Sequence, residues 1–191
     1  YDTKGAIEYA IHKTRDLAID LHPTGALTMG TAGQELTEIY DLRAAGAAAI
    51  GNGEQLLAES GLLLRALQYV KPFSGVVLYR PIKPRVADGP VNEGAMSVRL
   101  GMKGSPAVAE ELAVHEAIEL AQYAQSHLHL VKISTAGSVE LVRQAKAKGI
   151  PVSCSVSALH LHSNETILET FDENYKVIPP LRTEEDRMAL W

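Results

Sequence analysis

Apolar positions along the chain alternate between a helical spacing and short continuous runs. Spacings of three and four predict helices from a cap at residues 2–3 to about residue 16, and over residues 35–44, 54–70, 106–125 and 138–148. Apolar runs predict strands at residues 17–21, 76–79, 127–133 and 150–156, with further short runs at 26–29 and 47–50. Such repeated strand–helix units are typical of parallel strands covered by helices. The pattern therefore predicts an α/β fold with a parallel sheet.

Prolines, glycines, a helix cap and the absence of nucleotide-binding motifs narrow the predicted fold. Residues 80–104 contain three prolines and several glycines, so we expect a long functional or covering loop there. Thr183 and Asp186 have the spacing of a capped helix start. Both a doubly wound sheet and a (β/α)8 barrel fit the alternation, but the glycine-rich dinucleotide and phosphate-binding motifs are missing. About five strand–helix units are fewer than eight, so a barrel interpretation requires an incomplete barrel.

The composition narrows the functional classes. The 191 residues, 46% of them apolar, are about one domain and enough for a core. With 18 basic and 23 acidic residues the net charge is −5, and no run of five like charges occurs, which argues against nucleic-acid and anionic-membrane partners. Cys154 is the only cysteine, which excludes an intrachain disulfide and a cysteine-based zinc site. Without a membrane span of roughly 18 apolar residues or a signal peptide, we expect a cytoplasmic protein.

Several segments together resemble the dihydroorotases, cyclic-amide hydrolases of pyrimidine biosynthesis in the amidohydrolase superfamily. Their order and spacing across residues 45–190 make the resemblance specific, and it points to the long-chain branch that can associate with aspartate carbamoyltransferase. The matching segments are residues 92–97 (NEGAMS), 99–101, 104–107, 133–140, 145–149, 174–182 and 185–187.

The resemblance implies a metal-dependent (β/α)8 TIM barrel with a flanking β domain. In that family a His-x-His metal pair and a substrate-binding arginine lie on the first strand, and the catalytic Asp and a following His come with the last strand. We expect the first of these pieces to precede the point where this sequence begins and the second to lie beyond Trp191. We therefore expect residues 1–191 to be the central portion of one barrel domain, about strands 3–7 with their helices. The barrel ends and the β domain are then absent from the sequence.

The resemblance also implies which positions hold the family's zinc, and this chain has other residue types there. Asn52 stands where a bridging Asp is expected, Tyr79 where a His follows the fifth strand, and Lys132 where a His follows the sixth. An amide oxygen is a weak ligand, a phenol with a pKa of about 10 is a poor one, and an ammonium has no lone pair. Ile178 stands at a substrate-binding Asn. We therefore predict no metal and no catalytic residue in this chain.

The remaining candidate residues leave alternatives open. His127 and His129 share one strand face, but an inward Lys132 would turn His129 outward toward the helices. His160, after the seventh strand, either lines the remains of the pocket or packs elsewhere. Lys132 either replaces the charge of the missing metal beside Tyr79 or points to solvent at the barrel mouth.

Four charged residues in the family-like segments are interpreted as structural. Glu93 and Arg99 are expected to hold the long loop after the fifth strand in place. Arg182 and Asp186 are expected to pin the loop after the last motif and to cap the helix that follows it.

Two principal functions stay open on the sequence alone. The first is a dihydroorotase homologue that has lost its metal centre and works in assembly, as a homodimer or as a scaffold for aspartate carbamoyltransferase. The second is an active cyclic-amide hydrolase with a reduced or displaced metal site, built from segments outside this sequence. A third reading, a barrel that binds a pyrimidine-like molecule without reaction, is weakened by Ile178.

Overall fold

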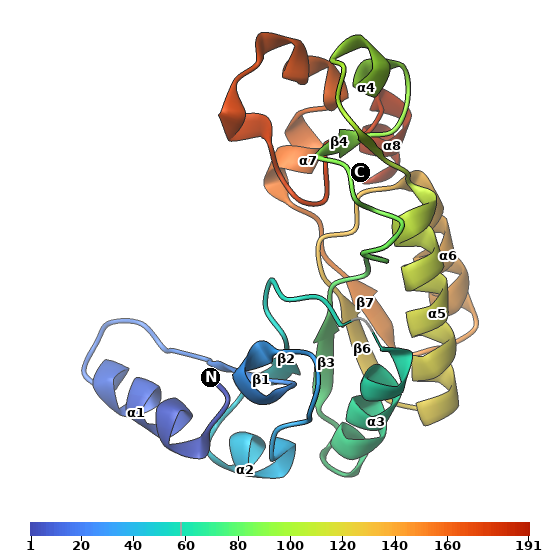
Figure 1. Cartoon of the computed structure of the whole chain (residues 1–191). Coiled ribbons are helices and arrows are strands. Elements are labelled where there is room, and N and C mark those ends of the chain that lie inside the picture. The colour runs from blue at the N-terminus through green and yellow to red at the C-terminus, as the bar shows by residue number, and fades with distance from the viewer. Residues whose placement is uncertain (58) are drawn as a thin grey trace. The chain divides into compact units, whose positions relative to one another are not determined.

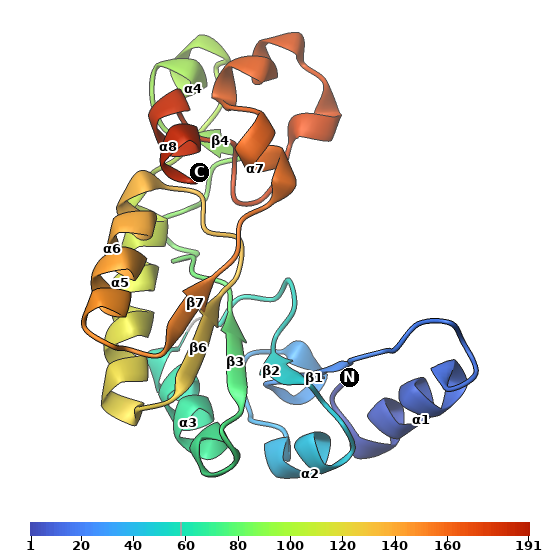
Figure 2. The same ribbon diagram turned by 180° about the vertical axis from the view of Figure 1, so that it is seen from behind.

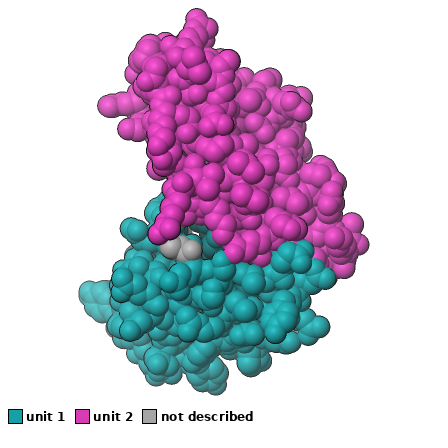
Figure 3. All heavy atoms as spheres, turned by 45° about the vertical axis from the view of Figure 1, so that its right-hand side comes forward, with its two compact units in different colours: residues 1–80, 119–129 teal, residues 81–118, 130–191 magenta. Residues whose placement is uncertain are grey.

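The computed structural model describes residues 1–57 and 59–191 (Figure 1), and Figure 2 shows the same ribbon from behind. The chain divides into two compact units, which Figure 3 colours separately. Unit 1 comprises residues 1–80 and 119–129, and unit 2 comprises residues 81–118 and 130–191. The helix α5 (Val108–Ala124) and the strand β6 (His127–Leu130) therefore contribute residues to both units.

Parallel strands form the centre of unit 1. They are neighbours in the order β1 (Thr24–Ala26), β2 (Ala49–Gly51), β3 (Val76–Tyr79) and β6. In the parallel register, Gly25 lies opposite Ile50, and Gly51 lies opposite Leu78. Because neighbouring strands that follow one another in the chain are parallel, each connection must cross over, and a helix does so.

Tyr1 forms two backbone hydrogen bonds with β1. Its amino group donates to the carbonyl oxygen of Thr24 at 3.4 Å, and its carbonyl oxygen accepts from the Ala26 nitrogen at 2.6 Å. Two such bonds on either side of Gly25 are the pattern of a parallel bridge. The helix α1 (Lys4–Thr14), which begins at the predicted Thr3 cap, follows Tyr1 in the chain.

Helices cover the strands of unit 1. The helix α2 (Ile39–Ala44) packs on β1, α3 (Ser60–Val70) packs on β3, and the two helices contact each other. Their inward faces supply buried leucines, among them Leu42, Leu62 and Leu67. Two short 3-10 helices complete the unit, at Met29–Thr31 (η1) and Lys71–Phe73 (η2).

Unit 2 is built around the helix α6. This helix packs on the strand β7 (Val152–Cys154) and on the helix α8 (Glu184–Ala189), and the helix α7 (Ala158–His162) packs on α8 as well. The short strands β4 and β5 pair in parallel. Apart from its share of α5 and β6, the elements of the unit are β4 (Val91–Asn92), α4 (Ala95–Arg99), β5 (Gly104–Ser105), α6 (Ala136–Ala147), β7 (Val152–Cys154), α7 (Ala158–His162), η3 (Glu165–Thr170), η4 (Glu173–Tyr175) and α8 (Glu184–Ala189).

The predicted strand at residues 17–21 is wrong. The segment has no regular structure, and Leu17 and Ile19 are 57% and 68% exposed. An apolar run forms a strand only beside a partner that takes up its N–H and C=O groups, and within the described ranges no strand lies next to this one. The chain instead enters the sheet at Thr24.

The other predicted elements are present with shifted ends. The helices predicted from residues 35 and 54 begin at Ile39 and Ser60. Leu36 instead forms an isolated antiparallel bridge with Thr28, and Gly53 and Glu54 form a turn. Residues 80–104 include the short elements β4 and α4 rather than a loop alone. No helix in the described ranges is both long and apolar enough to cross a membrane.

The close approach of β2 and β3 yields a stability prediction. A Cβ on Gly51 would lie 2.8 Å from the Leu78 Cβ and 2.9 Å from the Leu78 carbonyl oxygen. We therefore expect Gly51→Ala to lower the free energy of unfolding by about 1–3 kcal/mol, because backbone must move. Gly61→Ala is the matched control, since an added Cβ meets nothing within 4 Å there, and it should raise that energy by about 0.5 kcal/mol. Urea unfolding followed by circular dichroism compares them, and equal stabilities would contradict the close approach.

Candidate functional site

The residues predicted for the site fall in both units. Asn52 and Tyr79 belong to unit 1, whereas Lys132, His160 and Ile178 belong to unit 2. Asn52, Tyr79 and His160 are buried, Lys132 is half-buried, and Ile178 is 64% exposed. Each residue is described within its own unit. Because Lys132 and Tyr79 belong to different units, their pairing stays a prediction.

Asn52 follows β2, and its side-chain amide forms three hydrogen bonds with the loop after β1. Its Oδ1 accepts from the Thr28 nitrogen at 3.1 Å and from the Thr28 hydroxyl at 2.9 Å, and its Nδ2 donates to the Thr31 carbonyl oxygen at 3.2 Å. Because a backbone N–H only donates and a carbonyl only accepts, these partners define the orientation of the amide. A carboxylate has no hydrogen for Thr31, so this position fits an amide.

The loop that Asn52 holds is tightly curled. Gly30 and Thr31 both have a φ of 56°, a left-handed conformation that is uncommon for threonine. The Thr28 hydroxyl also accepts from the Gly33 nitrogen at 2.9 Å. The amide of Asn52 is therefore part of a hydrogen-bonded clamp on residues 28–33, with 5% of its residue surface exposed.

The strand β6 partly confirms the predicted alternation. Leu128 and Leu130 are buried, His127 is exposed and His129 is half-buried, so the two histidines do share the face opposite the leucines. Burial lowers the pKa of His129. The period of two cannot be extended to Lys132, because the strand ends at Leu130 and Lys132 has a φ of 59°.

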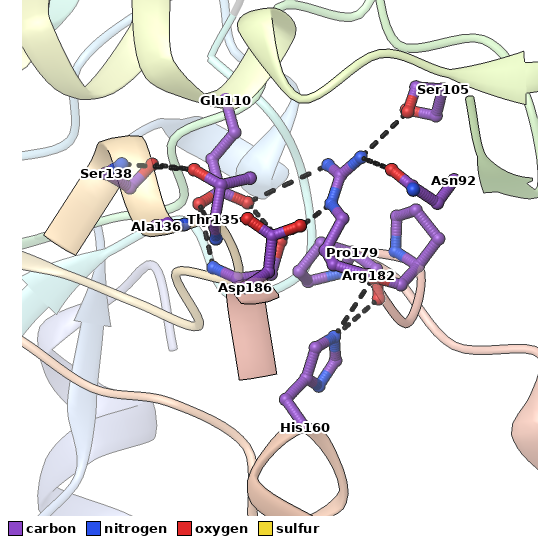
Figure 4. A network of polar contacts seen from close by, with 12 residues as sticks. Asn92, Ser105, Glu110, Thr135, Ala136, Ser138, His160, Pro179, Arg182 and Asp186 are labelled. Atoms are coloured by element: carbon purple, nitrogen blue, oxygen red, sulfur yellow. Dashed lines mark hydrogen bonds and ion pairs between the residues drawn. The ribbon is translucent and has the colours of Figure 1, made fainter. Parts of the chain in front are cut away.

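A buried carboxylate organises the polar network of unit 2 (Figure 4). Glu110, in the first turn of α5, is 2% exposed. Its Oε1 accepts from the backbone nitrogens of Ser134 at 2.7 Å and Thr135 at 3.2 Å, and its Oε2 accepts from the Ser134 hydroxyl. The carboxylate thereby holds the chain between β6 and α6 against the start of α5. Its Oε2 also lies 4.0 Å from the Nη2 of Arg182.

Arg182 carries the positive charge of the same network. It is 4% exposed; its Nε donates to the Ser134 Oγ at 3.1 Å, and its Nη1 donates to the Asn92 Oδ1 at 2.9 Å and the Ser105 carbonyl oxygen at 2.8 Å. Burial lowers the pKa of Arg182, while the carboxylate of Glu110 acts in the opposite direction. One guanidinium therefore ties β4, β5 and the chain after β6 to the segment before α8.

Asp186 completes the network from the first turn of α8. Its Oδ1 accepts from the Ala136 nitrogen at 2.8 Å, and its Oδ2 accepts from the Thr183 nitrogen at 3.2 Å and hydroxyl at 2.7 Å. The predicted cap between Thr183 and Asp186 is therefore confirmed as a capping box. The structural roles expected of Arg182 and Asp186 are confirmed by these contacts.

His160 packs under the turn that leads to Arg182. Its Nε2 lies 3.1 Å from the Pro179 carbonyl oxygen and 3.3 Å from that of Pro180, so Nε2 carries the hydrogen. Its buried Nδ1 has no hydrogen-bond partner in the described part of the chain. Burial lowers the pKa of His160, and the two carbonyls and Glu110 only partly offset this. The imidazole is therefore neutral at neutral pH.

Sequence reasoning missed Glu110. A glutamate in the first turn of a helix is normally a solvated residue that complements the helix dipole. Glu110 has this position, directly after the Ser105–Pro106 helix entry, so its local signal matches that of an exposed residue. Only the distant Ser134 and Arg182 account for its burial.

The described residues do not fit the zinc centre implied by the resemblance. In residues 1–57 and 59–191, no group of three His, Cys, Asp or Glu side chains is arranged to hold a metal. The amide oxygen of Asn52 already accepts two hydrogen bonds. The oxygens of Glu110 and Asp186 accept from backbone nitrogens and hydroxyls. Their donor atoms are thus committed to the fold.

Comparisons with a family model and with curated proteins identify the same family. The model of the family described as Dihydro-orotase-like matches residues 1–138. The chain is 39% identical over 193 residues to a dihydroorotase from Streptomyces coelicolor, and 40% identical over 194 residues to one from Leifsonia xyli. Each alignment covers 99% of this chain but only 45% and 44% of the relative. The chain thus spans less than half the length of these curated relatives.

Solved structures show the fold. The chain superposes on an L-hydantoinase (dihydropyrimidinase) from Arthrobacter aurescens with a TM-score of 0.80 at 22% identity, covering 99% of this chain and 44% of that one. A D-hydantoinase structure matches with a TM-score of 0.75 at 22% identity, covering 100% and 44%. The chain therefore has the fold of part of an α/β barrel, which confirms the predicted fold class.

The buried charge pair of unit 2 yields the second prediction. We expect Arg182→Met to lower the free energy of unfolding by about 3–5 kcal/mol, because Glu110 then keeps a buried charge without its cation. The double variant Glu110→Gln/Arg182→Met should be more stable than Arg182→Met alone. Arg143→Met is the control, since its pair with Glu140 is exposed and should change stability by less than about 1 kcal/mol. Urea unfolding measures all three, and equal effects of the two arginine substitutions would contradict the network.

The buried imidazole yields a pH prediction. The pKa of His160 is lowered in the folded protein, so the unfolded chain takes up the proton first as the pH falls. The stability that His160 contributes is therefore complete above about pH 6.5 and is lost as the pH falls through the folded-state pKa, by at most about 1.4 kcal/mol per pH unit.

His160→Gln keeps a donor for the proline carbonyls and removes the titration, so it should flatten the fall in stability between about pH 7 and 5. His162→Gln, an exposed position on the same helix, is the matched control and should leave the slope unchanged. Thermal unfolding at several pH values tests this. Parallel curves for the wild type and His160→Gln would show that His160 does not cause the dependence.

Proposed function

Because the chain belongs to the Dihydro-orotase-like family, we propose that it is a dihydroorotase-like homologue whose residues no longer build a metal-dependent hydrolase site. The observation that carries this proposal is the buried amide of Asn52. It stands where the resemblance implies a metal-bridging carboxylate, and its oxygen and nitrogen are bonded to Thr28 and Thr31. The position serves the loop after β1 rather than an ion.

The other substituted positions support the same conclusion. Hydrolysis of a cyclic amide near neutral pH calls for an activated water, a Lewis acid and a carboxylate that moves protons. Tyr79 and Lys132 supply a phenol and an ammonium, which do not replace imidazole ligands. Ile178, at the substrate-binding position, offers only an apolar side chain. Carboxylates that remain, such as Glu110, are occupied by backbone N–H groups.

A homologue without its own chemistry is best explained by a role in assembly. We propose that this protein works in the cytoplasm as a homodimer or as a scaffold for aspartate carbamoyltransferase, which the resemblance to the long-chain branch supports. Unit 1 exposes apolar side chains that suit an interface, since Tyr9, Ile19 and Tyr123 are 64%, 68% and 73% exposed.

The proposal is tested by restoring the family's residue. We expect Asn52→Asp to lower the free energy of unfolding by about 1–3 kcal/mol, because the new carboxylate faces the Thr31 carbonyl in a buried site. Asn52→Ala is the comparison that removes the same hydrogen bonds without adding a charge. Adding zinc should leave the stability of Asn52→Asp unchanged. A zinc-dependent rise in its melting temperature would contradict the proposal, because a bound ion stabilises the folded state.

The activity itself is tested on the full-length protein. Metal analysis and an assay of dihydroorotate hydrolysis should find less than stoichiometric zinc and no turnover. Stoichiometric zinc together with turnover would overturn the proposal in favour of an active hydrolase with a displaced metal site. Light scattering after size-exclusion chromatography, with and without aspartate carbamoyltransferase, should detect a dimer or a complex. A monomer in both samples would remove the assembly role.

A further inference from the structure

Unit 2 contains a cavity whose lining does not include Glu110, Arg182 or Asp186. Its volume is about 330 Å³, and it lies between the β4–β5 segment and the segment of η3 and η4. Leu100, Met102 and Leu168 give it apolar walls. Ligand pockets in proteins run from about 300 to 1,000 Å³, so this one suits a ligand of amino-acid size rather than a nucleotide.

The two walls of the cavity are joined by polar contacts. The Arg99 Nη1 lies 2.6 Å from the Glu169 Oε1, and the Asn92 Nδ2 donates to the Glu165 Oε2 at 2.7 Å. Asn92 is itself held by the buried guanidinium of Arg182. The cavity is therefore formed before any ligand arrives, which reduces the entropy lost on binding.

Phe171, which lines this cavity, has an unusual backbone. It is 70% exposed and has a φ of 55°, a left-handed conformation in which glycine or asparagine is the usual residue. Among the described non-glycine residues with positive φ, it is the only apolar one. Burial within the chain does not explain why a phenyl ring stands there. Phe171 is the left-handed C-cap of η3, and this position leaves its exposed ring at the lining of the cavity.

Charges of both signs line the same cavity. Asp172, Glu173 and Lys176 are all exposed at its lining. Within the described ranges, the side chains of Glu173 and Lys176 form no hydrogen bond or ion pair with the rest of the chain. Asp172 accepts through its Oδ1 from Asn174. The cavity thus combines an apolar interior with anionic and cationic groups that are available to a ligand.

We propose that this cavity binds a small zwitterion with an apolar side chain, of the class of leucine or phenylalanine. The side chain of the ligand occupies the apolar walls beside the ring of Phe171. Its ammonium group faces Asp172 and Glu173, and its carboxylate faces Lys176. This binding site is independent of the assembly role proposed above, because none of its residues belongs to the substituted metal positions.

The ligand class is tested by isothermal titration calorimetry on the whole chain with L-phenylalanine. We expect saturable binding of one ligand. Phenethylamine lacks the carboxylate and 3-phenylpropionate lacks the ammonium, so each should bind about threefold more weakly or worse, the scale of an exposed ion pair. Absence of saturable L-phenylalanine binding at millimolar concentrations would overturn the proposal. Equal affinity for all three compounds would also overturn it, because the charges would then play no part.

Two variants test separately how the Phe171 ring and the Lys176 charge contribute to binding. Phe171→Gly removes the strained phenyl ring, so the melting temperature should be unchanged or higher while L-phenylalanine binding falls at least about fivefold. Lys176→Met should weaken L-phenylalanine and 3-phenylpropionate about threefold and leave phenethylamine unchanged. Lys148→Met, an exposed lysine at the end of α6, is the matched control and should change nothing. Unaltered binding in Phe171→Gly, or an equal effect of Lys176→Met on phenethylamine, would contradict the site.

Discussion

The opposite charges of Glu110 and Arg182 constrain the segments of unit 2 that surround them. Each side chain is almost wholly removed from water, and a charge in that position must find its hydrogen bonds in the protein. Glu110 finds them on the chain between β6 and α6, and Arg182 finds them on β4 and β5. Short strands and a loop that would not hold together alone are thereby anchored to the start of α5. The network positions backbone segments of unit 2.

The same requirement explains the role of Asn52 in unit 1. A buried polar group is stable only where each donor meets an acceptor, and the amide of Asn52 meets one carbonyl and two donors. If residue 52 were an aspartate, a carboxylate oxygen would face the Thr31 carbonyl oxygen, and neither atom has a hydrogen to donate. Such an arrangement would need an ion between the two oxygens. A chain with an amide at this position therefore gains an ordered loop after β1 without needing an ion. The proposed loss of a metal centre is compatible with a stable barrel segment for this reason.

The parts of the fold that were predicted correctly depend on neighbours in the sequence. The Thr3 and Thr183 caps and the strand at Val76–Tyr79 are encoded within a few residues, and all three are present. The strand expected at residues 17–21 failed because strand formation depends on a partner, which an apolar run alone does not reveal. Glu110 was missed for a related reason, since its burial is decided by Ser134 and Arg182, far along the chain. The residue type at Asn52 led to the expectation of no metal there, which stays a prediction, and gave no sign of the hydrogen bonds to Thr28 and Thr31.

Phe171 shows how a rigid network permits strain elsewhere. A left-handed phenylalanine would relax if the segments on either side were free to move, so it persists only where its surroundings hold it. The contacts of Asn92 with Glu165 and of Arg99 with Glu169 hold the two walls of the cavity, and Asn92 is bonded in turn to Arg182. The buried charge pair therefore maintains a cavity some distance from it. In this unit, hydrogen bonds lead from Arg182 through Asn92 to Glu165 in η3, the short helix that ends at Phe171.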